Sequence, residues 1–352
     1  MPRAEGAEPE AELTSQGVQP AADVPAGLLD WFRASDGCFA ANFELTVFEY
    51  QGRGVRGKQA FRKGDLLLTC PLAMALSARA ARESADVGPI AKECGDSLGR
   101  DDVLALFIMH ERRKGANSAH AEHIDSIPRE YDQTLFWADN ELAEIVGSNV
   151  HALTQSLAVQ VREDHEALLK ALESSAYELT LLADTPFTLE EYRWALATIW
   201  SRSMDIAVAV DNGADADGSM RVIVPVADMF NTSKETTEAV HFYDPNVDSL
   251  KILAAADSVP QDQLMICYGK LSNARAAWLY GFVIPENPED DVELYATMTP
   301  ETKSYDRRVA LLEELGRTVE SLAEPHKLTM ADPLPMPLRV SLRVQVRQSR
   351  TF

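Results

Sequence analysis

The pattern of hydrophobic and polar residues changes along the chain, and several short stretches follow the pattern of β-strands. Residues 43–50 read FELTVFEY, and residues 239–246 and 249–257 place β-branched and aromatic residues on either side of an Asp-Pro-Asn turn. A further apolar stretch, residues 264–268, stops at Gly269. These segments predict β-strands.

A glycine-rich stretch follows the first of these strands. Residues 52–57 read GRGVRG and predict a turn, and the turn residues 63–65 lead into an apolar strand that ends at Pro71. Two glycines flank Arg53, which lets a ligand approach the backbone closely. A plain hairpin explains the same glycines equally well.

In the middle of the chain, residues 78–200, the spacing of apolar residues is typical of helices instead. Asp101 can cap a helix whose apolar residues recur on one face and whose end is marked by Gly115. Ser272 can cap a later helix. The other helices that the pattern predicts span residues 28–32, 141–147, 150–182, 189–204 and 303–322.

Composition and charge narrow the classes of function. The chain has 352 residues, and its 33 Lys and Arg against 55 Asp and Glu give a formal net charge of -22. Binding nucleic acid through phosphates needs a clustered basic face, so this class is not expected. A basic protein partner suits the charge, although acidic soluble proteins are common. A monomer is expected.

Cysteine and histidine spacing gives no sign of a metal site. The four cysteines lie far apart without a Cys-x-x-Cys pair, so neither disulfides nor a cysteine-rich zinc site is expected. We interpret the histidines of the middle part as ordinary helix and loop residues, because they lie on separate elements: His110, His123, His151 and His165.

Targeting signals are not evident either. No apolar run approaches the roughly 20 residues that span a bilayer. Residues 1–25 mix Pro, Gly and acidic residues and predict a disordered lead-in that has neither the apolar core of a signal peptide nor the composition of a transit peptide. We therefore expect a protein of the cytoplasm or nucleus without membrane contact.

Three islands of unusual composition stand close together in the last third of the chain. They read VPVADMFNTS over residues 224–233, LMICYG over residues 264–269 and SNARAAWLYGF over residues 272–282. Their order and spacing resemble the SET-domain methyltransferases, in particular the subgroup typified by the Rubisco large-subunit lysine methyltransferase and the actin-histidine methyltransferase. That subgroup carries an ADM-x-NH island, a YG-x-x-SNAE island and a YGF or SGF close.

The resemblance implies an α+β fold with five segments. These are a lead-in (1–25), the first part of a SET core of small curved β-sheets (26–80), a large helical insert (81–204), the second part of the core (205–285) and the truncated start of a helical substrate-binding domain (286–352). The SET core passes its C-terminal segment through a loop, a pseudoknot that is a rare exception among folds. The chain is either a fragment or a shortened member.

The resemblance also implies S-adenosylmethionine as cofactor and assigns roles to residues. Tyr268 matches the catalytic tyrosine, and Leu271 stands near the channel. The substrate channel is bordered by Ser203, Met204 and Tyr280. The cofactor-binding residues are Gln51, Gly52, Arg53, Arg202, Asp228, Asn231, Thr232 and Phe282. Read alone, Arg202 is a solvated arginine at a helix C-terminus and Tyr268 a core aromatic.

Two positions depart from the subgroup's pattern. Gln51 stands where the subgroup has Glu, so a carboxylate contact to the cofactor is lost or becomes an amide contact. Thr232 stands where the subgroup has His, a change that the backbone contact tolerates or that marks a decayed site.

The residues fit methyl transfer to an amine, which needs alignment and a deprotonated nucleophile. Tyr268 can offer a phenolic oxygen, and Tyr280 and Phe282 can offer ring faces that favour cations. The resemblance therefore implies an S-adenosylmethionine-dependent protein-lysine N-methyltransferase that acts on a non-histone protein, with lysine as acceptor because most of the family uses it. A protein-histidine N-methyltransferase and a non-catalytic SET-like binding protein are the alternatives.

Overall fold

The computed structural model describes residues 24–94, 98–177, 185–208, 218–322 and 324–346. The lead-in expected over residues 1–25 lies almost entirely outside this range, as does the end of the helix expected over residues 150–182. Within the described residues the chain mixes helices with small antiparallel sheets, so the α+β expectation is confirmed.

In the described part of the main body the strands form three small sheets. One has the order β1-β4-β9-β8, with bounds Phe39–Ala40, Leu66–Pro71, Ser249–Leu253 and His241–Asp244. A second has the order β10-β3-β2, with bounds Gln263–Leu264, Gly52–Gly57 and Phe43–Phe48. A third has the order β5-β7-β6, with bounds Leu76–Ser77, Ser219–Ile223 and Met204–Ala207.

The glycine-rich stretch is a strand, and the turn predicted there was wrong. Residues 52–57 form β3, which pairs with β2 from Phe48↔Gly52 to Phe43↔Gly57 and with β10 on its other side. The turn lies earlier, at residues 49–51. Gly54 serves close approach instead, because a Cβ there would lie 2.7 Å from the side-chain nitrogens of both Asn231 and Gln263.

The strand predicted over residues 264–268 is also shorter than expected. Only Gln263 and Leu264 pair with β3, as β10. Beyond them Met265 forms a parallel bridge with Asn231, and the Ile266 N–H donates to the Asn231 carbonyl at 2.8 Å. This bridge lays the second island of the sequence directly beside the first.

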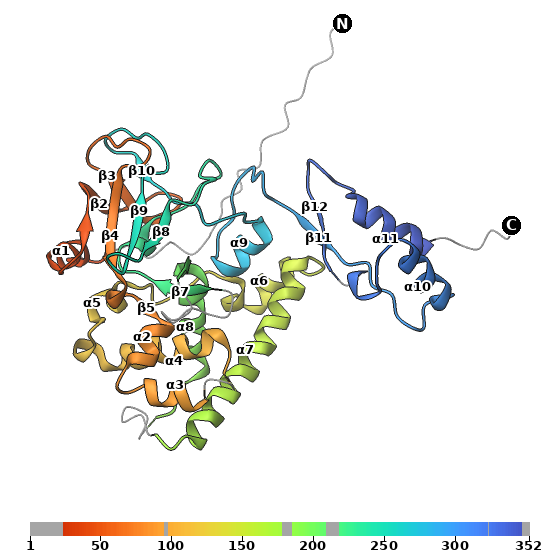
Figure 1. Ribbon diagram of the computed structural model, residues 1–352, viewed down its shortest axis with the longest axis horizontal. Coiled ribbons are helices and arrows are strands. Elements are labelled where there is room, and N and C mark those ends of the chain that lie inside the picture. The colour runs from red at the N-terminus through yellow and green to blue at the C-terminus, as the bar shows by residue number, and fades with distance from the viewer. Residues whose placement is uncertain (1–23, 95–97, 178–184, 209–217, 323, 347–352) are drawn as a thin grey trace, which may run out of the picture.

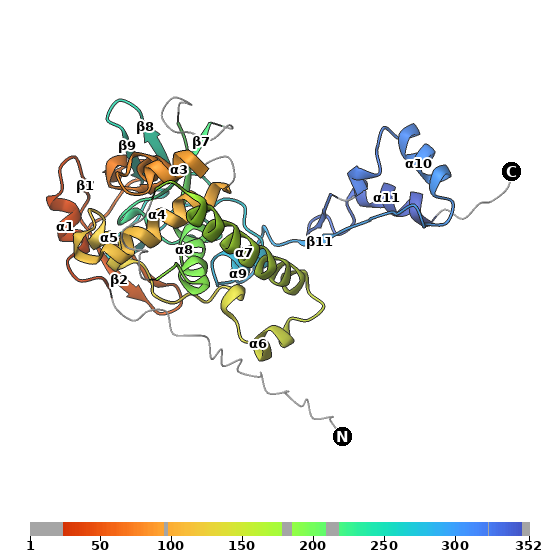
Figure 2. The same cartoon turned by 90° about the horizontal axis from the view of Figure 1, so that it is seen from below.

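Helices form the second layer of the main body. The longer ones are α4 (Arg100–Lys114), α7 (Asn149–Ser174) and α8 (Leu189–Arg202), and the shorter ones are α1 (Leu28–Ala34), α2 (Ala78–Glu83), α3 (Gly88–Cys94), α5 (Ala121–Ser126), α6 (Asp139–Glu144) and α9 (Asn273–Leu279). In Figure 1 most of the strands lie in the upper part of this body, and α2, α3, α4 and α7 lie in the lower part. Figure 2 views the same body from below.

The helix boundaries differ from the predictions at three places. Helix α4 is capped at Gly99, whose N–H donates to the Asp102 carboxylate at 2.6 Å, so Asp101 is not the cap. Ser272 does hold the N-cap position of α9, but its side chain makes no capping hydrogen bond. Helix α8 ends at Arg202, because Met204 already pairs with Val222 in β6.

Each layer has its own hydrophobic core. The helical core includes Leu104, Ile108 and Tyr192, and the sheet core includes Phe43 and Phe230, all of them almost fully buried. Burial of apolar area is the main favourable term in folding, so each core stabilises its part of the main body. The helical core also includes Leu76 of β5 and Ile223 of β7, which join the third sheet to the helices.

The last part of the chain folds around a third, much smaller core. It contains the hairpin of β11 (Val292–Leu294) and β12 (His326–Leu328), with α10 (Tyr305–Glu314) and α11 (Met336–Val346). The helix expected over residues 303–322 is interrupted, because Gly316 adopts a positive φ of 68°. Figures 1 and 2 show this part set apart from the main body.

Within the described ranges, no helix combines the length and apolarity that crossing a bilayer requires.

Candidate functional site

Two cavities meet at the junction of the sheets and α8. The first, of about 470 Å³, is lined mainly by residues 203–205, 232–241, 266–271 and 284–289. The second, of about 670 Å³, is lined mainly by residues 50–53, 125–132, 229–231 and 281–282. Both volumes fall in the range of small-molecule sites. The walls that they share are formed by Ser201, Arg202, Asp228, Tyr268 and Tyr280.

Tyr268 is held at the shared wall through both its side-chain hydroxyl and its backbone N–H. Its hydroxyl donates to the Phe230 carbonyl at 2.7 Å, and its N–H donates to the Thr232 hydroxyl at 3.3 Å. Burial, followed by the neighbouring Tyr280, raises the pKa of Tyr268 well above that of a free phenol, although Arg202 opposes the shift. The phenol is therefore protonated at neutral pH, and its remaining lone pair is free to accept a hydrogen bond.

Two further aromatic rings continue this wall. Tyr280 stacks on Tyr268 with ring centroids 5.2 Å apart, and Phe282 meets Tyr280 edge to face at 5.7 Å. Gly281 between them has a φ of +80°, and a Cβ there would lie 2.7 Å from the backbone carbon of Asp132. The close packing of this turn on the loop after α5 fixes where the rings stand.

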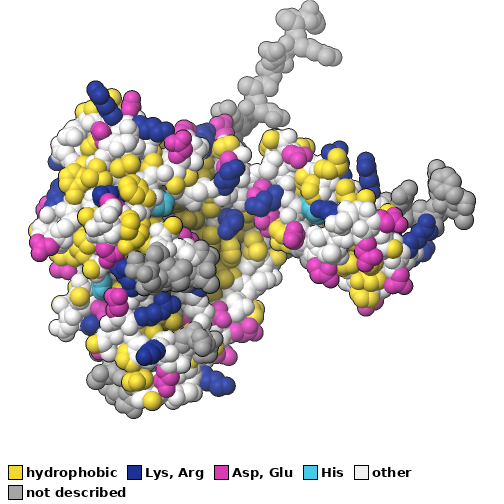
Figure 3. All heavy atoms as spheres, viewed as in Figure 1, with side chains coloured by type: hydrophobic (Ala, Val, Ile, Leu, Met, Phe, Trp, Pro, Cys, Tyr) yellow, Lys and Arg dark blue, Asp and Glu magenta, His cyan; other side chains and the backbone are white. Residues whose placement is uncertain are grey.

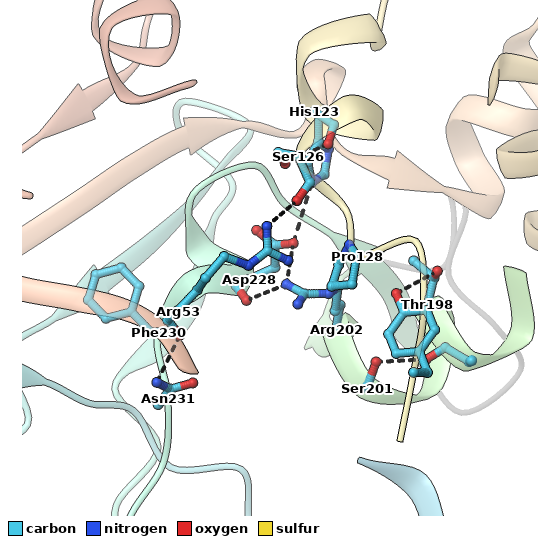
Figure 4. A network of polar contacts seen from close by, with 12 residues as sticks. Arg53, His123, Ser126, Pro128, Thr198, Ser201, Arg202, Asp228, Phe230 and Asn231 are labelled. Atoms are coloured by element: carbon cyan, nitrogen blue, oxygen red, sulfur yellow. Dashed lines mark hydrogen bonds and ion pairs between the residues drawn. The ribbon is translucent and has the colours of Figure 1, made fainter. Parts of the chain in front are cut away.

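A buried carboxylate lies behind the shared wall. The Asp228 side chain is fully buried in the short 3₁₀ turn Ala227–Met229, and its Oδ2 accepts from Arg202 Nη1 at 3.1 Å. The His123 imidazole lies 3.7 Å from the same oxygen. Burial favours the neutral acid, but His123 and Arg202 outweigh it and lower the pKa of Asp228. Figure 4 shows these groups turned toward one another.

Arg53 reaches the same cluster from β3. Its Nη1 donates to the Ser126 carbonyl at 2.8 Å, and its own carbonyl accepts from Asn231 Nδ2 at 3.0 Å. Burial and the positive charge of Arg202 lower the pKa of Arg53 to about 10. Asn231 therefore ties β3 to the first sequence island, and both segments contribute to the wall of the second cavity (Figure 4).

Several buried polar atoms at this junction have no hydrogen-bond partner among the described residues. They are Arg53 Nη2, Arg202 Nε, Asp228 Oδ1 and both ring nitrogens of His123. Buried polar groups are normally paired, so a cluster of unpaired ones beside a cavity is typical of a binding site.

The residues expected to bind a cofactor lie mostly on the second cavity. Gln51, Gly52, Arg53, Asn231 and Phe282 line it, and Arg202 and Asp228 line both cavities. Thr232 lies on the first cavity instead, where its hydroxyl holds the backbone of Tyr268.

The residues expected at a substrate channel lie on the first cavity. Ser203, Met204 and Leu271 line it, and Tyr280 is shared by both cavities. Tyr268, the expected catalytic residue, stands between the two groups of residues.

Sequence reasoning missed two contributors to the site. His123 was interpreted as an ordinary helix residue, yet it is fully buried against Asp228. Asn273 was noted only as part of a motif, yet its amide exchanges hydrogen bonds with the Ile284 backbone at 3.1 and 2.8 Å and so holds one wall of the first cavity. Both contacts join residues far apart in the chain or on irregular loops, which hydrophobic periodicity does not reveal.

Among the described residues no three His, Cys, Asp or Glu side chains are grouped as metal ligands. On the face drawn in Figure 3, basic and acidic side chains are interspersed and form no continuous basic stripe.

Comparisons with known proteins agree with this geometry. No protein-family model matches the chain. The actin-histidine N-methyltransferase of Mus musculus is 23% identical over 319 residues, which cover 90% of this chain and 52% of the relative. The Homo sapiens protein of the same name is 23% identical over 301 residues, which cover 85% of this chain and 49% of the relative. The chain thus spans about half the length of these curated relatives.

Solved structures match over most of the chain. Rubisco LSMT bound to AdoMet gives a TM-score of 0.76 at 22% identity and covers 93% of this chain and 71% of that one. The SET domain of LSMT bound to lysine and AdoHcy gives a TM-score of 0.75 at 22% identity, and the match covers 91% of this chain and 70% of that one. The chain therefore has the SET-domain fold. Within that class it is similar to Rubisco LSMT in structure and to the actin-histidine N-methyltransferases in sequence, which confirms the resemblance that the three islands indicated.

Proposed function

We propose that this chain is an S-adenosylmethionine-dependent protein N-methyltransferase whose acceptor is a lysine side chain of a non-histone protein. The observation that carries the proposal is the meeting of two cavities at the Tyr268 phenol. Transfer of a group between two bound partners requires both reacting atoms in one narrow junction, and such alignment supplies much of the rate enhancement.

The second cavity suits the cofactor. S-Adenosylmethionine, when bound, supplies a methyl group on a sulfonium sulfur for in-line displacement by an amine. The Arg202 guanidinium, whose Nε has no partner in the described part of the chain, suits the carboxylate of the cofactor. Gly52 and Asn231 bring backbone and amide groups to the same cavity, and the half-exposed Phe282 offers a ring at its mouth.

The first cavity suits the acceptor. Because the phenol of Tyr268 is protonated and donates to Phe230, it can accept a hydrogen bond but cannot serve as a general base. The amine must therefore lose its proton before transfer. A lysine has a reference pKa of about 10.4, which burial beside Tyr268 and Tyr280 lowers.

A histidine acceptor is the second candidate, since the curated relatives are named actin-histidine N-methyltransferases. The third candidate, a non-catalytic binding protein, rests on Thr232. Its hydroxyl accepts the N–H of Tyr268, so this substitution has a positioning role that weighs against a decayed site.

Labelled methyl transfer tests the proposal. The purified chain is incubated with methyl-labelled S-adenosylmethionine and a protein extract, beside Tyr268→Phe. We expect the variant to lose about a hundredfold in rate, the order seen when one preorganised hydrogen-bonding group is removed. Calorimetry should show micromolar cofactor binding, about 8 kcal/mol, by both proteins. Equal labelling by both proteins, or no binding by the folded wild type, contradicts the proposal.

The same assay repeated across pH separates the two acceptors. A lysine amine gains reactivity as it deprotonates, so the rate should keep rising above pH 8. An imidazole, with a reference pKa of about 6.5, is already neutral there and gives a flat profile. Because the pKa of Tyr268 is raised, its ionisation does not distort either profile at neutral pH.

A further inference from the structure

Two of the four cysteines lie opposite each other at the end of β1, outside both cavities. β1 pairs with β4 in an antiparallel register that ends at Phe39↔Thr69. Continuing this register by one residue places Cys38 opposite Cys70. The two cysteines are far apart in the sequence, so their spacing did not indicate this pairing, which depends on the fold alone.

The hydrogen bonds between the two strands bring these side chains close together. The Ala41 N–H donates to the Leu67 carbonyl at 2.9 Å, and the alternation of an antiparallel ladder then makes Cys38 and Cys70 a non-hydrogen-bonded pair. In agreement, the Cys38 N–H donates to the Ser35 carbonyl at 3.2 Å instead of to β4. Pairs of this kind bring Cα atoms to about 4.5 Å, within the range of about 4.4–6.8 Å that a disulfide spans.

The two thiols interact and differ in their surroundings. Cys38 is half-buried, and its Sγ donates to Met74 Sδ at 3.2 Å, whereas Cys70 is fully buried. The hydrogen bond from Cys70 lowers the pKa of Cys38, although burial opposes the shift. The same hydrogen bond, followed by burial, raises the pKa of Cys70. The thiol that solvent can reach is therefore the one that ionises more readily, which suits a pair in which one thiol is oxidised first and the other resolves it.

We propose that Cys38 and Cys70 form a site of reversible oxidation, at which a peroxide converts the two thiols into a cross-strand disulfide. The Cys38 thiolate attacks one peroxide oxygen, the O–O bond breaks, and a sulfenic acid forms while the proton of Cys38 leaves with the released hydroxide as water. The Cys70 sulfur then attacks the Cys38 sulfur, the S–O bond breaks, and the hydroxide leaves with the proton of Cys70 as a second water. The peroxide gains the two electrons that the sulfurs lose.

The disulfide has a structural consequence that does not depend on the proposed function. It ties β1 to β4 and closes a loop over residues 39–69, which contains β2 and β3. Closing such a loop removes conformational freedom from the unfolded chain, so the oxidised protein should resist unfolding more than the reduced one. The other cysteines lie elsewhere, Cys94 at the end of α3 and Cys267 on the first cavity, and serve as internal controls.

Peptide mapping tests the proposal. The reduced, folded chain is treated with hydrogen peroxide, its remaining thiols are alkylated, and the linked cysteines are identified by mass spectrometry. We expect the wild type to fall from four free thiols to two, with a Cys38–Cys70 link that dithiothreitol removes. Cys38→Ser should form no link, and the matched control Cys94→Ala should form the same link as wild type.

Urea provides two further measurements. Oxidation should raise the urea midpoint of the wild type by about 0.5–1 M and leave that of Cys38→Ser unchanged. Peroxide treatment in urea should give mixed pairings, because only the native register selects Cys70 as the partner of Cys38.

Three results would overturn the proposal. The first is a link between other cysteines in the folded wild type. The second is a sulfinic or sulfonic acid at Cys38, or a sulfoxide at Met74, without any link. The third is a linked protein whose urea midpoint equals or falls below that of the reduced protein, because the bond would then distort the strands that it joins.

Discussion

The two cavities share a wall, but they are built differently. The second is closed by part-buried contacts between distant segments: Arg202 with Asp228, Arg53 with the Ser126 carbonyl, and Asn231 with the Arg53 carbonyl. The first is bordered by loops, and exposed ion pairs link them, Lys234 with Glu286 at 3.2 Å and Lys270 with Glu289 at 3.8 Å.

This difference indicates different tasks. Buried hydrogen bonds and ion pairs hold side chains in one arrangement, which suits a ligand that never changes. Exposed ion pairs contribute little and are screened by salt, so loops joined by them can adapt to a larger partner. Changes at the second cavity should therefore alter cofactor affinity, and changes at the first should alter the response to the protein substrate.

Gly281→Ala should have the largest effect, because it disturbs the wall that both cavities share. The new Cβ would lie 2.7 Å from Asp132 at a φ of +80°. Strain at positive φ and overpacking together should lower the free energy of unfolding by about 2–4 kcal/mol. Urea denaturation measures this loss, and both cofactor affinity and turnover should fall with it.

Gly269→Ala is the matched control. Gly269 has a φ of +91°, but nothing lies within 4 Å of the position of its Cβ. Gly269→Ala should therefore lower the free energy of unfolding only by the cost of placing alanine at positive φ, about 1–2 kcal/mol. Equal losses for the two variants would mean that packing of the Tyr280–Phe282 turn on the Asp132 loop adds no stability, and the shared wall would then be looser than the contacts indicate.

Asn231→Ala should act on one cavity. Removing the amide leaves the Arg53 carbonyl without the hydrogen bond at 3.0 Å, so β3 is less firmly placed. We expect the Kd for S-adenosylmethionine to rise about tenfold, the equivalent of about 1.4 kcal/mol and one hydrogen bond. Calorimetric titration checks the value.

Asn273→Ala is the corresponding change at the first cavity. Its amide holds Ile284 and so supports the first cavity. It should raise the KM for the protein substrate and leave cofactor affinity within about twofold. If both asparagine variants change both quantities alike, the two cavities act as one unit and the comparison is wrong.

Much of the site was predictable because its residues come in local islands. The first and second islands were singled out from the sequence, and the bridge between Asn231 and Met265 lays them side by side. Tyr268 and Tyr280 were both singled out, and the stacking of their rings places them on one wall. The helical middle part was also predicted, and in α7 the buried residues do recur with a helical period. Helix α4 is different, because every residue from Asp102 to Glu111 is buried and its burial is not confined to one face.

The remaining features depend on contacts that no local pattern encodes. The glycines of residues 52–57 predict a turn by composition, but pairing with β2 and β10 makes them a strand. His123 has no distinguishing neighbours in the sequence, and only the fold brings it to Asp228. The division of the chain into five segments and the roles given to individual site residues stay predictions.

Lys234→Ala should have the smallest effect of the series, and its size decides whether the first cavity is adaptable. The Lys234 side chain is 35% exposed and its partner Glu286 is 89% exposed, so solvent already screens their ion pair. We expect the KM for the protein substrate to change by only about twofold at low salt and to match wild type at high salt, as for other exposed pairs. A double-mutant cycle with Glu286→Ala isolates the pair from other roles of either side chain. A tenfold change that persists at high salt would instead show that Lys234 contacts the substrate directly, and the first cavity would then be as rigidly specified as the second.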